Sequence, residues 1–321
     1  MKEKLQLEEF SLGFLKKYLL LYSMIFNNLD TLSTHFGNKK KKPCLHTRKR
    51  SNMMLNPLNL KHLNRMDESE ADMITLNLED AIAPSRKKEA LHNIALFLSY
   101  MEHSDSFIII RTNPLNEGGA EEIAYLNDFS FDAIRVAKVK NQTEIAQALT
   151  LLSKDKELHI SLETKEAFED LSTLCIDERL TTANLGILDL LTSLGLPQSL
   201  VTLNNPTIDY ILSKFLVDAK TAGIHPISFM FQEYNDTEKF KAWCEHEKLM
   251  GFESKACMGP KQVQLANEIF SIDSHELTRA RHIKESFEAH EAQGINGFMD
   301  DTYGFIDEPI YRDSLLILNK I

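Results

Sequence analysis

From residue 51 onward, short apolar segments alternate with longer segments whose apolar residues recur at helical spacing. The short segments are rich in Ile, Leu, Val and Met, as expected for strands that are buried on both faces. The eight strand segments are Asn52–Asn56, Met73–Leu78, Phe107–Arg111, Ala133–Val139, Leu158–Glu163, Ala183–Leu188, Pro226–Phe231 and Lys255–Met258. The clearest helical segments between them are Gln142–Lys154, Lys165–Leu174 and Ile208–Lys220. This alternation predicts βαβ units and a parallel sheet.

The number and spacing of these segments favour a closed (β/α)₈ TIM barrel in the α/β class. A chain of 321 residues, 43% of them hydrophobic, is long enough for one such barrel with additions. We expect an N-terminal extension over residues 1–45, a catalytic barrel over 46–275 and a C-terminal helical lid segment over 276–321. A doubly wound open sheet is the alternative, but no strand segment is followed by a Gly-rich dinucleotide-binding turn.

Charge is distributed unevenly along the chain. Residues 1–50 contain eleven Lys or Arg against four Asp or Glu, within a chain whose net charge is −11. The basic run Lys39–Pro43 has the charge to bind nucleic acid or an anionic membrane, but a solvated linker is the simpler interpretation of so short a run. The apolar segment Tyr18–Phe26 is shorter than the roughly 20 residues that cross a bilayer, and no signal-peptide cleavage site follows it. We expect neither nucleic-acid binding nor a membrane span.

The cysteines follow no metal-binding or disulfide pattern. Cys44, Cys175, Cys244 and Cys257 are widely separated, and none of them forms a C-x-x-C pair. Such spacing argues against a zinc site and against a disulfide framework. It favours a protein of the reducing cytoplasm.

Charged side chains follow five consecutive strand segments. In chain order they are Glu79 and Asp80, Arg111, Lys138, Glu163 and Asp189, the last in the loop expected after the sixth segment. In a barrel, all strands open at their C-terminal ends onto one face, where catalytic residues collect. A single charged loop residue carries little information, but charges at five successive strand ends predict one cluster of acids with Arg and Lys.

The residue types in this cluster fit a hard metal ion and a developing enolate. Glu163 and Asp189, from adjacent strand ends, can take two positions of an octahedral Mg²⁺ and leave the others for water and substrate oxygens. No His or Cys accompanies them, which favours Mg²⁺ over zinc, and Mn²⁺ shares this ligand chemistry. Arg111 offers a planar fork to a carboxylate or enolate oxygen. A metal ion and an Arg are what a retro-aldol or Claisen-type carbon–carbon cleavage needs.

Several short motifs from about His46 to Ile321 resemble the citrate lyase beta-subunit and malyl-CoA lyase family of Mg²⁺-dependent barrel enzymes. The motifs are Arg50-Ser51, LNLEDAIAPSRKKEA (Leu76–Ala90), IIIRTN (Ile108–Asn113), VAKVKN (Val136–Asn141), LET (Leu162–Thr164), GILD (Gly186–Asp189) and GFESKACMGPKQV (Gly251–Val263). Within these motifs, three positions depart from the family pattern: Asn77, Ala137 and Gly259 stand where the family has Asp, Pro and His.

The resemblance implies a lyase that cleaves a β-hydroxyacyl-CoA of the malyl- or citramalyl-CoA type to acetyl-CoA and a keto acid. It implies Mg²⁺ on Glu163 and Asp189, and enolate stabilisation by Arg111. Glu79 and Asp80 would then contact the metal waters and fix Arg111. Three basic residues would contact the CoA phosphates or the substrate carboxylate: Arg50, Lys87 and Lys138.

In relatives of the malyl-CoA type, a C-terminal segment from a neighbouring subunit covers the site and brings an acid. The similar segment here is Gly297–Pro309, in which Tyr303 occupies a Gly position of the family motif. We expect Asp301 to be the general acid/base, with Asp300 as its rival, in a homo-oligomer that is a trimer or larger. Two alternatives stay open: an aldolase or hydrolase of free keto acids, and a non-catalytic assembly homologue that uses the basic N-terminal extension.

Overall fold

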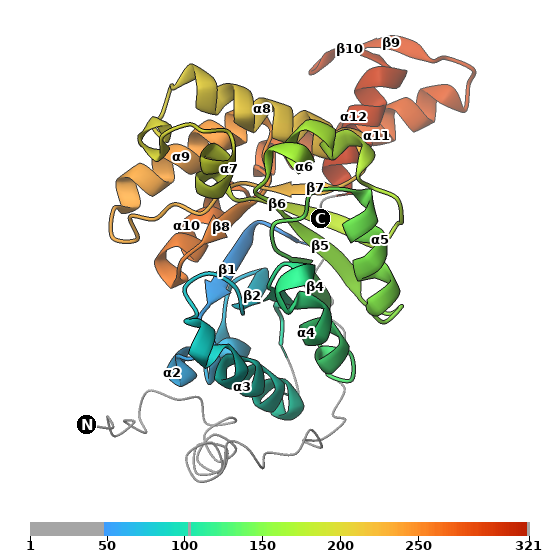
Figure 1. The fold of residues 1–321 in the computed structure, drawn as a ribbon. Helices are drawn as coiled ribbons and strands as arrows, with labels where there is room; N and C mark the ends of the chain where they lie inside the picture. The colour runs from blue at the N-terminus through green and yellow to red at the C-terminus, as the bar shows by residue number, and fades with distance from the viewer. Residues whose placement is uncertain (1–47, 102–103, 320–321) are drawn as a thin grey trace. The chain divides into compact units, whose positions relative to one another are not determined.

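The computed structural model describes residues 48–101 and 104–319 (Figure 1). The chain divides into two compact units, one that ends at Ile269 and one that begins at Phe270. Each unit has a hydrophobic core of its own. The expected N-terminal extension, its basic run and Cys44 lie outside the described residues.

The first unit is built on eight parallel strands. In chain order they are β1 (Ser51–Leu55), β2 (Met73–Asn77), β3 (Phe107–Thr112), β4 (Ala133–Val136), β5 (Glu157–Leu162), β6 (Leu180–Leu185), β7 (His225–Ile227) and β8 (Lys255–Cys257). Each strand from β1 to β7 pairs with its neighbour in sequence, and β1 also pairs with β8. A parallel bridge from Ser228, just beyond β7, to Lys255 in β8 nearly closes the barrel. The predicted TIM-like fold is therefore confirmed, and the open doubly wound sheet is wrong.

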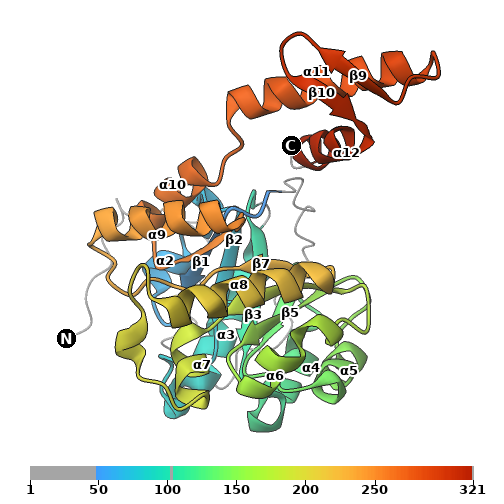
Figure 2. The same ribbon diagram turned by 90° about the horizontal axis from the view of Figure 1, so that it is seen from above.

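Helices follow the strands and lie around the outside of the sheet (Figures 1 and 2). They are α2 (Leu60–Leu63), α3 (Lys87–Tyr100), α4 (Gly119–Leu126), α5 (Gln142–Leu151), α6 (Lys165–Asp170), α7 (Ile187–Ser193), α8 (Pro206–Thr221), α9 (Thr237–Met250) and α10 (Pro260–Ile269). Side-chain oxygens of Asn141, Thr164, Asn205 and Asp236 cap the N-termini of α5, α6, α8 and α9. Across the described part of the chain, every helix is too short or too polar to cross a membrane.

Three strands end three or four residues earlier than the sequence pattern predicts. The expected strand Pro226–Phe231 ends at Ile227. The expected strand Ala133–Val139 ends at Val136, and Lys138 adopts a left-handed φ of 53°. The expected strand Ala183–Leu188 ends at Leu185, so Asp189 lies in the first turn of helix α7 and not in a loop. Where a continuous run of apolar residues passes from a buried strand into a buried helical turn, the spacing of apolar residues does not change at the point where the strand ends. The end of the strand therefore cannot be read from the sequence.

The barrel interior combines an apolar cluster with a chain of polar side chains. The apolar cluster consists of Met73, Ile109, Ala133, Ile227 and Ala256. Nearby, the Thr75 hydroxyl donates to Asn52 Oδ1 at 2.7 Å, and the Asn52 amide donates to Asn184 Oδ1 at 3.0 Å. Thr75, Asn52 and Asn184 therefore form a chain of hydrogen-bonded polar side chains inside the barrel. Asn184 also lines the cavity at the C-terminal ends of the strands.

The second unit contains α11 (Ser274–Glu291), the hairpin of β9 (Gly297–Asp300) and β10 (Gly304–Asp307), and α12 (Glu308–Leu318). Ile283 and Phe287 of α11 form its core with Ile306 of β10. The ring of Phe287 stacks on that of Tyr311, with 4.5 Å between the ring centroids. The helical C-terminus was predicted, whereas the antiparallel hairpin within it was not.

A buried ion pair lies behind the junction of β7 and β8. Lys255 Nζ lies 2.5 Å from Glu247 Oε1, and the Ser228 hydroxyl donates to the same oxygen at 2.7 Å. Both charged side chains are fully buried, and Lys255 Nζ also lies 3.6 Å from the centroid of the Phe229 ring. Burial raises the pKa of Glu247, and Lys255 opposes that shift. Such a pair tolerates the loss of both charges better than the loss of one.

Lys255→Met is expected to lower the free energy of unfolding by about 3–5 kcal/mol, because it leaves Glu247 buried without its cation. Adding Glu247→Leu should restore most of that loss. Urea unfolding can be followed through the fluorescence of the single Trp, Trp243, whose ring centroid lies 5.8 Å from Lys255 Nζ. The matched control is Lys241→Met, which removes an exposed lysine and should cost at most about 0.5 kcal/mol. Equal effects of the two single substitutions would contradict a structural role for the pair.

Candidate active site

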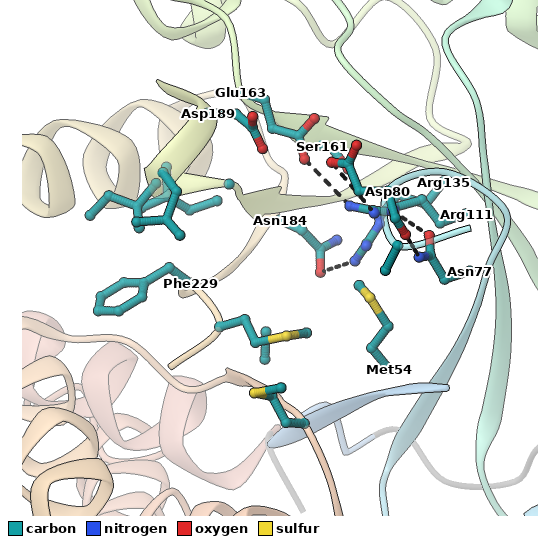
Figure 3. Close-up of a pocket in the computed structure, with 18 of the residues that line it drawn as sticks. Met54, Asn77, Asp80, Arg111, Arg135, Ser161, Glu163, Asn184, Asp189 and Phe229 are labelled. Carbon is teal, nitrogen blue, oxygen red and sulfur yellow. Dashed lines mark hydrogen bonds and ion pairs between the residues drawn. The ribbon is translucent and has the colours of Figure 1, made fainter. Parts of the chain in front are cut away.

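A cavity of about 340 Å³ lies at the C-terminal ends of the barrel strands (Figure 3). The polar and charged side chains that line it are Asn56, Asn77, Asp80, Arg111, Arg135, Ser161, Glu163, Asn184, Asp189 and Gln232. The larger apolar side chains that line it are Met54, Leu55, Leu185, Ile187, Leu188, Phe229, Met230 and Met258. Figure 3 shows the acids and arginines gathered together, with Met54 and Phe229 across from them. A cavity with a charged side and an apolar side suits a ligand that carries both polar and apolar parts.

Arg111, the penultimate residue of β3, is held by three side chains. Its Nε donates to Asn77 Oδ1 at 2.7 Å. Its Nη2 lies 2.6 Å from Glu79 Oε2, and its Nη1 lies 3.6 Å from Glu163 Oε1. The side chain is only 9% exposed. The guanidinium is therefore fixed in place between two buried carboxylates.

Asn77, one of the departures from the family pattern, organises the loop after β2. Its side-chain oxygen accepts from Arg111 and from the Glu79 backbone N–H, the latter at 3.1 Å. Its amide nitrogen donates to the Asp80 carbonyl oxygen at 2.5 Å. An Asp could accept the first two hydrogen bonds, but an ionised carboxylate could not donate the third. The loop continues through Ala81, whose left-handed φ of 68° costs on the order of 1 kcal/mol or more.

Glu79 and Asp80 are adjacent but electrostatically different. Burial alone would raise the pKa of Glu79, but Arg111, with help from Asp80 and Lys138, lowers it to about 2. Lys138 Nζ lies 2.7 Å from Glu79 Oε1 and 3.5 Å from Asp80 Oδ1. Burial and the neighbouring Glu79 raise the pKa of Asp80, whose side chain is 54% exposed. Glu79 is thus a fixed anion that holds two cations, and Asp80 is the more accessible acid.

Glu163 and Asp189 face the same cavity from β5 and α7. Glu163 follows the last residue of β5 and is 4% exposed. Burial raises its pKa to about 7 against the opposing effect of Arg111, and Asp189 adds to the rise. Glu163 Oε2 has no hydrogen-bond partner among the described residues. Gly186 lies directly against this side chain, since a Cβ at that position would lie 2.3 Å from Glu163 Cγ.

This donor set fits Mg²⁺. The ion commonly takes one or two protein carboxylates and completes its octahedron with waters and substrate oxygens. Within residues 48–101 and 104–319, no three His, Cys, Asp or Glu side chains converge to form an all-protein metal site. The buried, unpartnered oxygen of Glu163 is the kind of group that a cation would satisfy.

The three basic residues expected to bind substrate lie in different places. Lys138 joins the cavity network through Glu79. Lys87, the first residue of α3, donates to Asn113 beside the loop that follows β2. Arg50 immediately precedes β1, at the opposite end of the barrel, and its Nε lies 2.8 Å from Asp72 Oδ2. The structure therefore brings Lys138 to the acids, places Lys87 near them and leaves Arg50 away from the cavity.

Within the C-terminal unit, the two candidate lid acids have different surroundings. Asp300 Oδ2 lies 2.7 Å from His282 Nε2, and Oδ1 accepts from the backbone N–H groups of Thr302 and Tyr303 at 2.9 Å each. These hydrogen bonds, with His282 first, lower the pKa of Asp300 to about 2. Asp301 is exposed in the turn between β9 and β10, and its side chain forms no hydrogen bond or ion pair with described residues. Asp301 is therefore the freer of the two acids.

The sequence interpretation missed five polar residues that line the cavity: Asn56, Arg135, Ser161, Asn184 and Gln232. Arg135 of β4 is 3% exposed, and its Nη1 donates to Asn184 Oδ1 at 2.9 Å. Burial and the neighbouring Arg111 lower its pKa to about 9, so it stays cationic at neutral pH. A signal was present, because a charged or amide residue inside an apolar strand must find polar surroundings within the barrel.

Comparisons with known proteins agree with this architecture. The HpcH/HpaI aldolase/citrate lyase family model matches residues 50–260. A (3S)-malyl-CoA thioesterase from Cereibacter sphaeroides is 29% identical over 228 residues, which cover 70% of this chain and 78% of the relative. An L-malyl-CoA/beta-methylmalyl-CoA lyase from Rhodobacter capsulatus is 27% identical over 260 residues, which cover 72% of this chain and 81% of the relative. Among solved structures, that of protein CitE from Mycobacterium tuberculosis in complex with magnesium, acetoacetate and coenzyme A matches with a TM-score of 0.66 at 15% identity. The match covers 85% of this chain and 98% of CitE.

The matched stretch contains all eight barrel strands and every residue that lines the cavity. The structural match, at low sequence identity, supports the same fold. The resemblance inferred from the motifs is thereby confirmed, and the chain belongs to the HpcH/HpaI aldolase/citrate lyase family.

Proposed function

We propose that the protein is a Mg²⁺-dependent lyase that cleaves a β-hydroxyacyl-CoA to acetyl-CoA and a keto acid. The observation that carries this proposal is the fixed Arg111 guanidinium beside the Glu163 and Asp189 carboxylates in one cavity. The relative from Rhodobacter capsulatus is named as a malyl-CoA lyase, and the CitE structure contains magnesium, acetoacetate and coenzyme A. Both names support a CoA thioester as the substrate class.

Cleavage moves the electron pair of the Cα–Cβ bond onto the thioester carbonyl while the hydroxyl loses its proton and becomes the keto group. Negative charge therefore develops on the thioester oxygen. Arg111 can stabilise that charge without reorganising, because Asn77 and Glu79 already hold its guanidinium. Mg²⁺, held by Glu163 and Asp189, would act as a Lewis acid toward the oxygens of the keto acid.

The remaining residues have supporting roles in this proposal. Glu79 holds Arg111 and Lys138, and Asp80, which lines the cavity, would contact the waters of a bound metal ion. The apolar side of the cavity suits the acyl and pantetheine parts of the substrate. Lys87 is a candidate contact for the CoA phosphates, and Arg50 receives no role. We also propose that the protein is cytoplasmic and forms a homo-oligomer, a trimer or larger. In this oligomer, Asp301 of one copy acts as the general acid/base in the active site of a neighbouring copy. Mn²⁺ would bind the same carboxylate ligands as Mg²⁺.

Hydrolysis of the thioester is the second candidate, because the Cereibacter sphaeroides relative at 29% identity is named as a malyl-CoA thioesterase. The two reactions release different products. A lyase gives acetyl-CoA and a keto acid, whereas a thioesterase gives free CoA, which carries a thiol, and the hydroxy acid. A thiol assay together with product chromatography on malyl-CoA therefore separates them.

Titration calorimetry of the full chain with Mg²⁺ and acetyl-CoA, alone and with glyoxylate or pyruvate, tests the proposal. Acetyl-CoA should bind more tightly when Mg²⁺ and a keto acid are present. Glu163→Gln should weaken Mg²⁺ binding by at least ~10-fold, because it removes an anionic ligand. The control Glu166→Gln alters an exposed acid of α6 and should change nothing. If Mg²⁺ binds but acetyl-CoA does not, an aldolase or hydrolase of free keto acids is favoured. If Mg²⁺ does not bind at all, the non-catalytic assembly homologue is favoured.

Gly186→Ala should weaken Mg²⁺ binding about 10-fold or more, because the added Cβ would displace Glu163 from its position. The measurement is the same calorimetric titration, with thermal unfolding as the check that the variant is folded. Ser199→Ala, an exposed site beyond α7, is the control. A folded Gly186→Ala variant with unchanged metal affinity would show that Glu163 does not bind the ion.

Asp301→Asn should lower kcat by about 10²–10⁴ with little change in KM, as expected when a general acid/base is lost. Asp300→Asn should instead weaken the hairpin, because the carboxylate bonded to His282 and to two backbone N–H groups is replaced. Steady-state kinetics and thermal unfolding of both variants distinguish the two outcomes. Full kcat in Asp301→Asn would place the acid/base elsewhere.

A further inference from the structure

The floor of the cavity contains hydrogen-bond donors that the mechanism above does not use. Arg135, Ser161 and Asn184 project from the adjacent strands β4, β5 and β6 and are 3%, 1% and 5% exposed. Three of their polar atoms, Arg135 Nε, Ser161 Oγ and Asn184 Nδ2, have no hydrogen-bond partner among the described residues. Buried polar groups are nearly always paired, so three unpaired donors beside one cavity indicate a ligand.

The hydrogen-bond chain in the barrel determines how the Asn184 amide is oriented. The Thr75 hydroxyl donates to Asn52 Oδ1 at 2.7 Å, which leaves the Asn52 amide nitrogen to donate to Asn184 Oδ1 at 3.0 Å. Arg135 Nη1 donates to the same Asn184 oxygen at 2.9 Å. With two donors directed at its oxygen, Asn184 presents its NH₂ group elsewhere. Asn184 therefore offers a donor, and not an acceptor, to a ligand.

Arg135 gives this group of donors a positive charge. Unlike Arg111, it forms no ion pair with any described carboxylate. Arg111 is its partner in the register of β3 and β4, so the two guanidinium groups repel each other. A bound anion would relieve that repulsion and satisfy the free donors at the same time.

The donors lie beneath the two metal-binding carboxylates. Ser161 lies in β5 two residues before Glu163, which directly follows the strand, so the two side chains point the same way and stand roughly 6–7 Å apart along the chain. Figure 3 shows Asn184, Ser161 and Arg135 next to Glu163 and Arg111 on the polar side of the cavity. A ligand held at Glu163 and Asp189 can therefore reach the floor with a second, short polar arm.

We propose that Arg135, Ser161 and Asn184 form an anion subsite for a second carboxylate on the keto-acid half of the substrate. This inference rests on the proposed function, because it takes the keto-acid head to lie at Glu163 and Asp189. The substrate is then a β-hydroxyacyl-CoA whose cleavage releases a short dicarboxylic keto acid. A keto acid with a single carboxylate would leave the floor donors unpaired and bind more weakly.

Oxaloacetate and 2-oxobutanoate are a matched pair of probes, because they differ only in a carboxylate or a methyl group at the far end. Each is titrated calorimetrically into the Mg²⁺-loaded full chain, with oxaloacetate freshly prepared. The wild-type protein should bind oxaloacetate at least ~10-fold more tightly than 2-oxobutanoate, since the second carboxylate gains charge-assisted hydrogen bonds.

Asn184→Asp is the sharpest variant, because it keeps the size of the side chain and the oxygen that accepts from Arg135 and Asn52. It replaces the free NH₂ donor with an anionic oxygen. Oxaloacetate affinity should fall about 10–100-fold and 2-oxobutanoate affinity less than about 3-fold. Ser161→Ala should show the same selectivity with a smaller loss, about 3–10-fold. The control Arg179→Met removes a surface arginine that pairs with Asp177 and should leave both affinities unchanged.

The outcomes separate the subsite from the function on which it rests. If neither acid binds the Mg²⁺-loaded wild type although acetyl-CoA binds with glyoxylate or pyruvate, the subsite is wrong and the lyase stands. If acetyl-CoA also fails to bind with those smaller keto acids, the proposed lyase itself is wrong. If both acids bind equally, or if both variants weaken the two acids in parallel, the subsite is wrong and the lyase stands. Thermal unfolding identifies a variant that does not fold; should that be Asn184→Asp, Ser161→Ala decides the question.

Discussion

Arg111 is the group that allows acids to be buried at the open end of this barrel. A carboxylate taken out of water without a partner carries a penalty of several kcal/mol, and Glu79 and Glu163 are only 3% and 4% exposed. The Arg111 guanidinium lies between them, 2.6 Å from the first and 3.6 Å from the second. Asn77 fixes the third edge of the same guanidinium. The geometry of the whole polar side of the cavity therefore depends on one cation from β3.

The unequal distances from Arg111 give the two acids different chemistry. Glu79 has Arg111 and Lys138 in close contact, and its pKa falls to about 2. Glu163 is farther from Arg111 and more deeply desolvated, so its pKa rises to about 7. Two carboxylates separated in this way take separate tasks. Glu79 is a permanent anion that holds the cations, whereas Glu163 keeps an oxygen available for a metal ion that favours its charged form.

The sequence predicted the barrel and the acids at its mouth because both follow from periodicity and topology. Strand ends meet at one face, so Glu79, Arg111 and Glu163 had to come together once the eight strands were recognised. Arg135, Ser161 and Asn184 were missed because they lie inside their strands, whereas the predicted cluster contained only residues at the strand ends. Arg50 was grouped with the site through a motif, although it precedes its strand and so lies at the other end.

Two departures from the family pattern, Ala137 and Gly259, lie around the charged centre of the cavity, whereas the third, Asn77, lies within it and accepts a hydrogen bond from Arg111. A Cβ at Gly259 would lie 3.0 Å from the ring of Tyr234, so a side chain at this position would require Tyr234 to shift by a few tenths of an ångström. Gln232 and Met258, the close neighbours of these two residues in the chain, line the cavity. Ala137 is buried beside the left-handed Lys138, which still reaches Glu79. Because Arg111, Glu79 and Glu163 keep their mutual contacts despite these changes, the differences bear on which acid fits the cavity rather than on how its bond is broken.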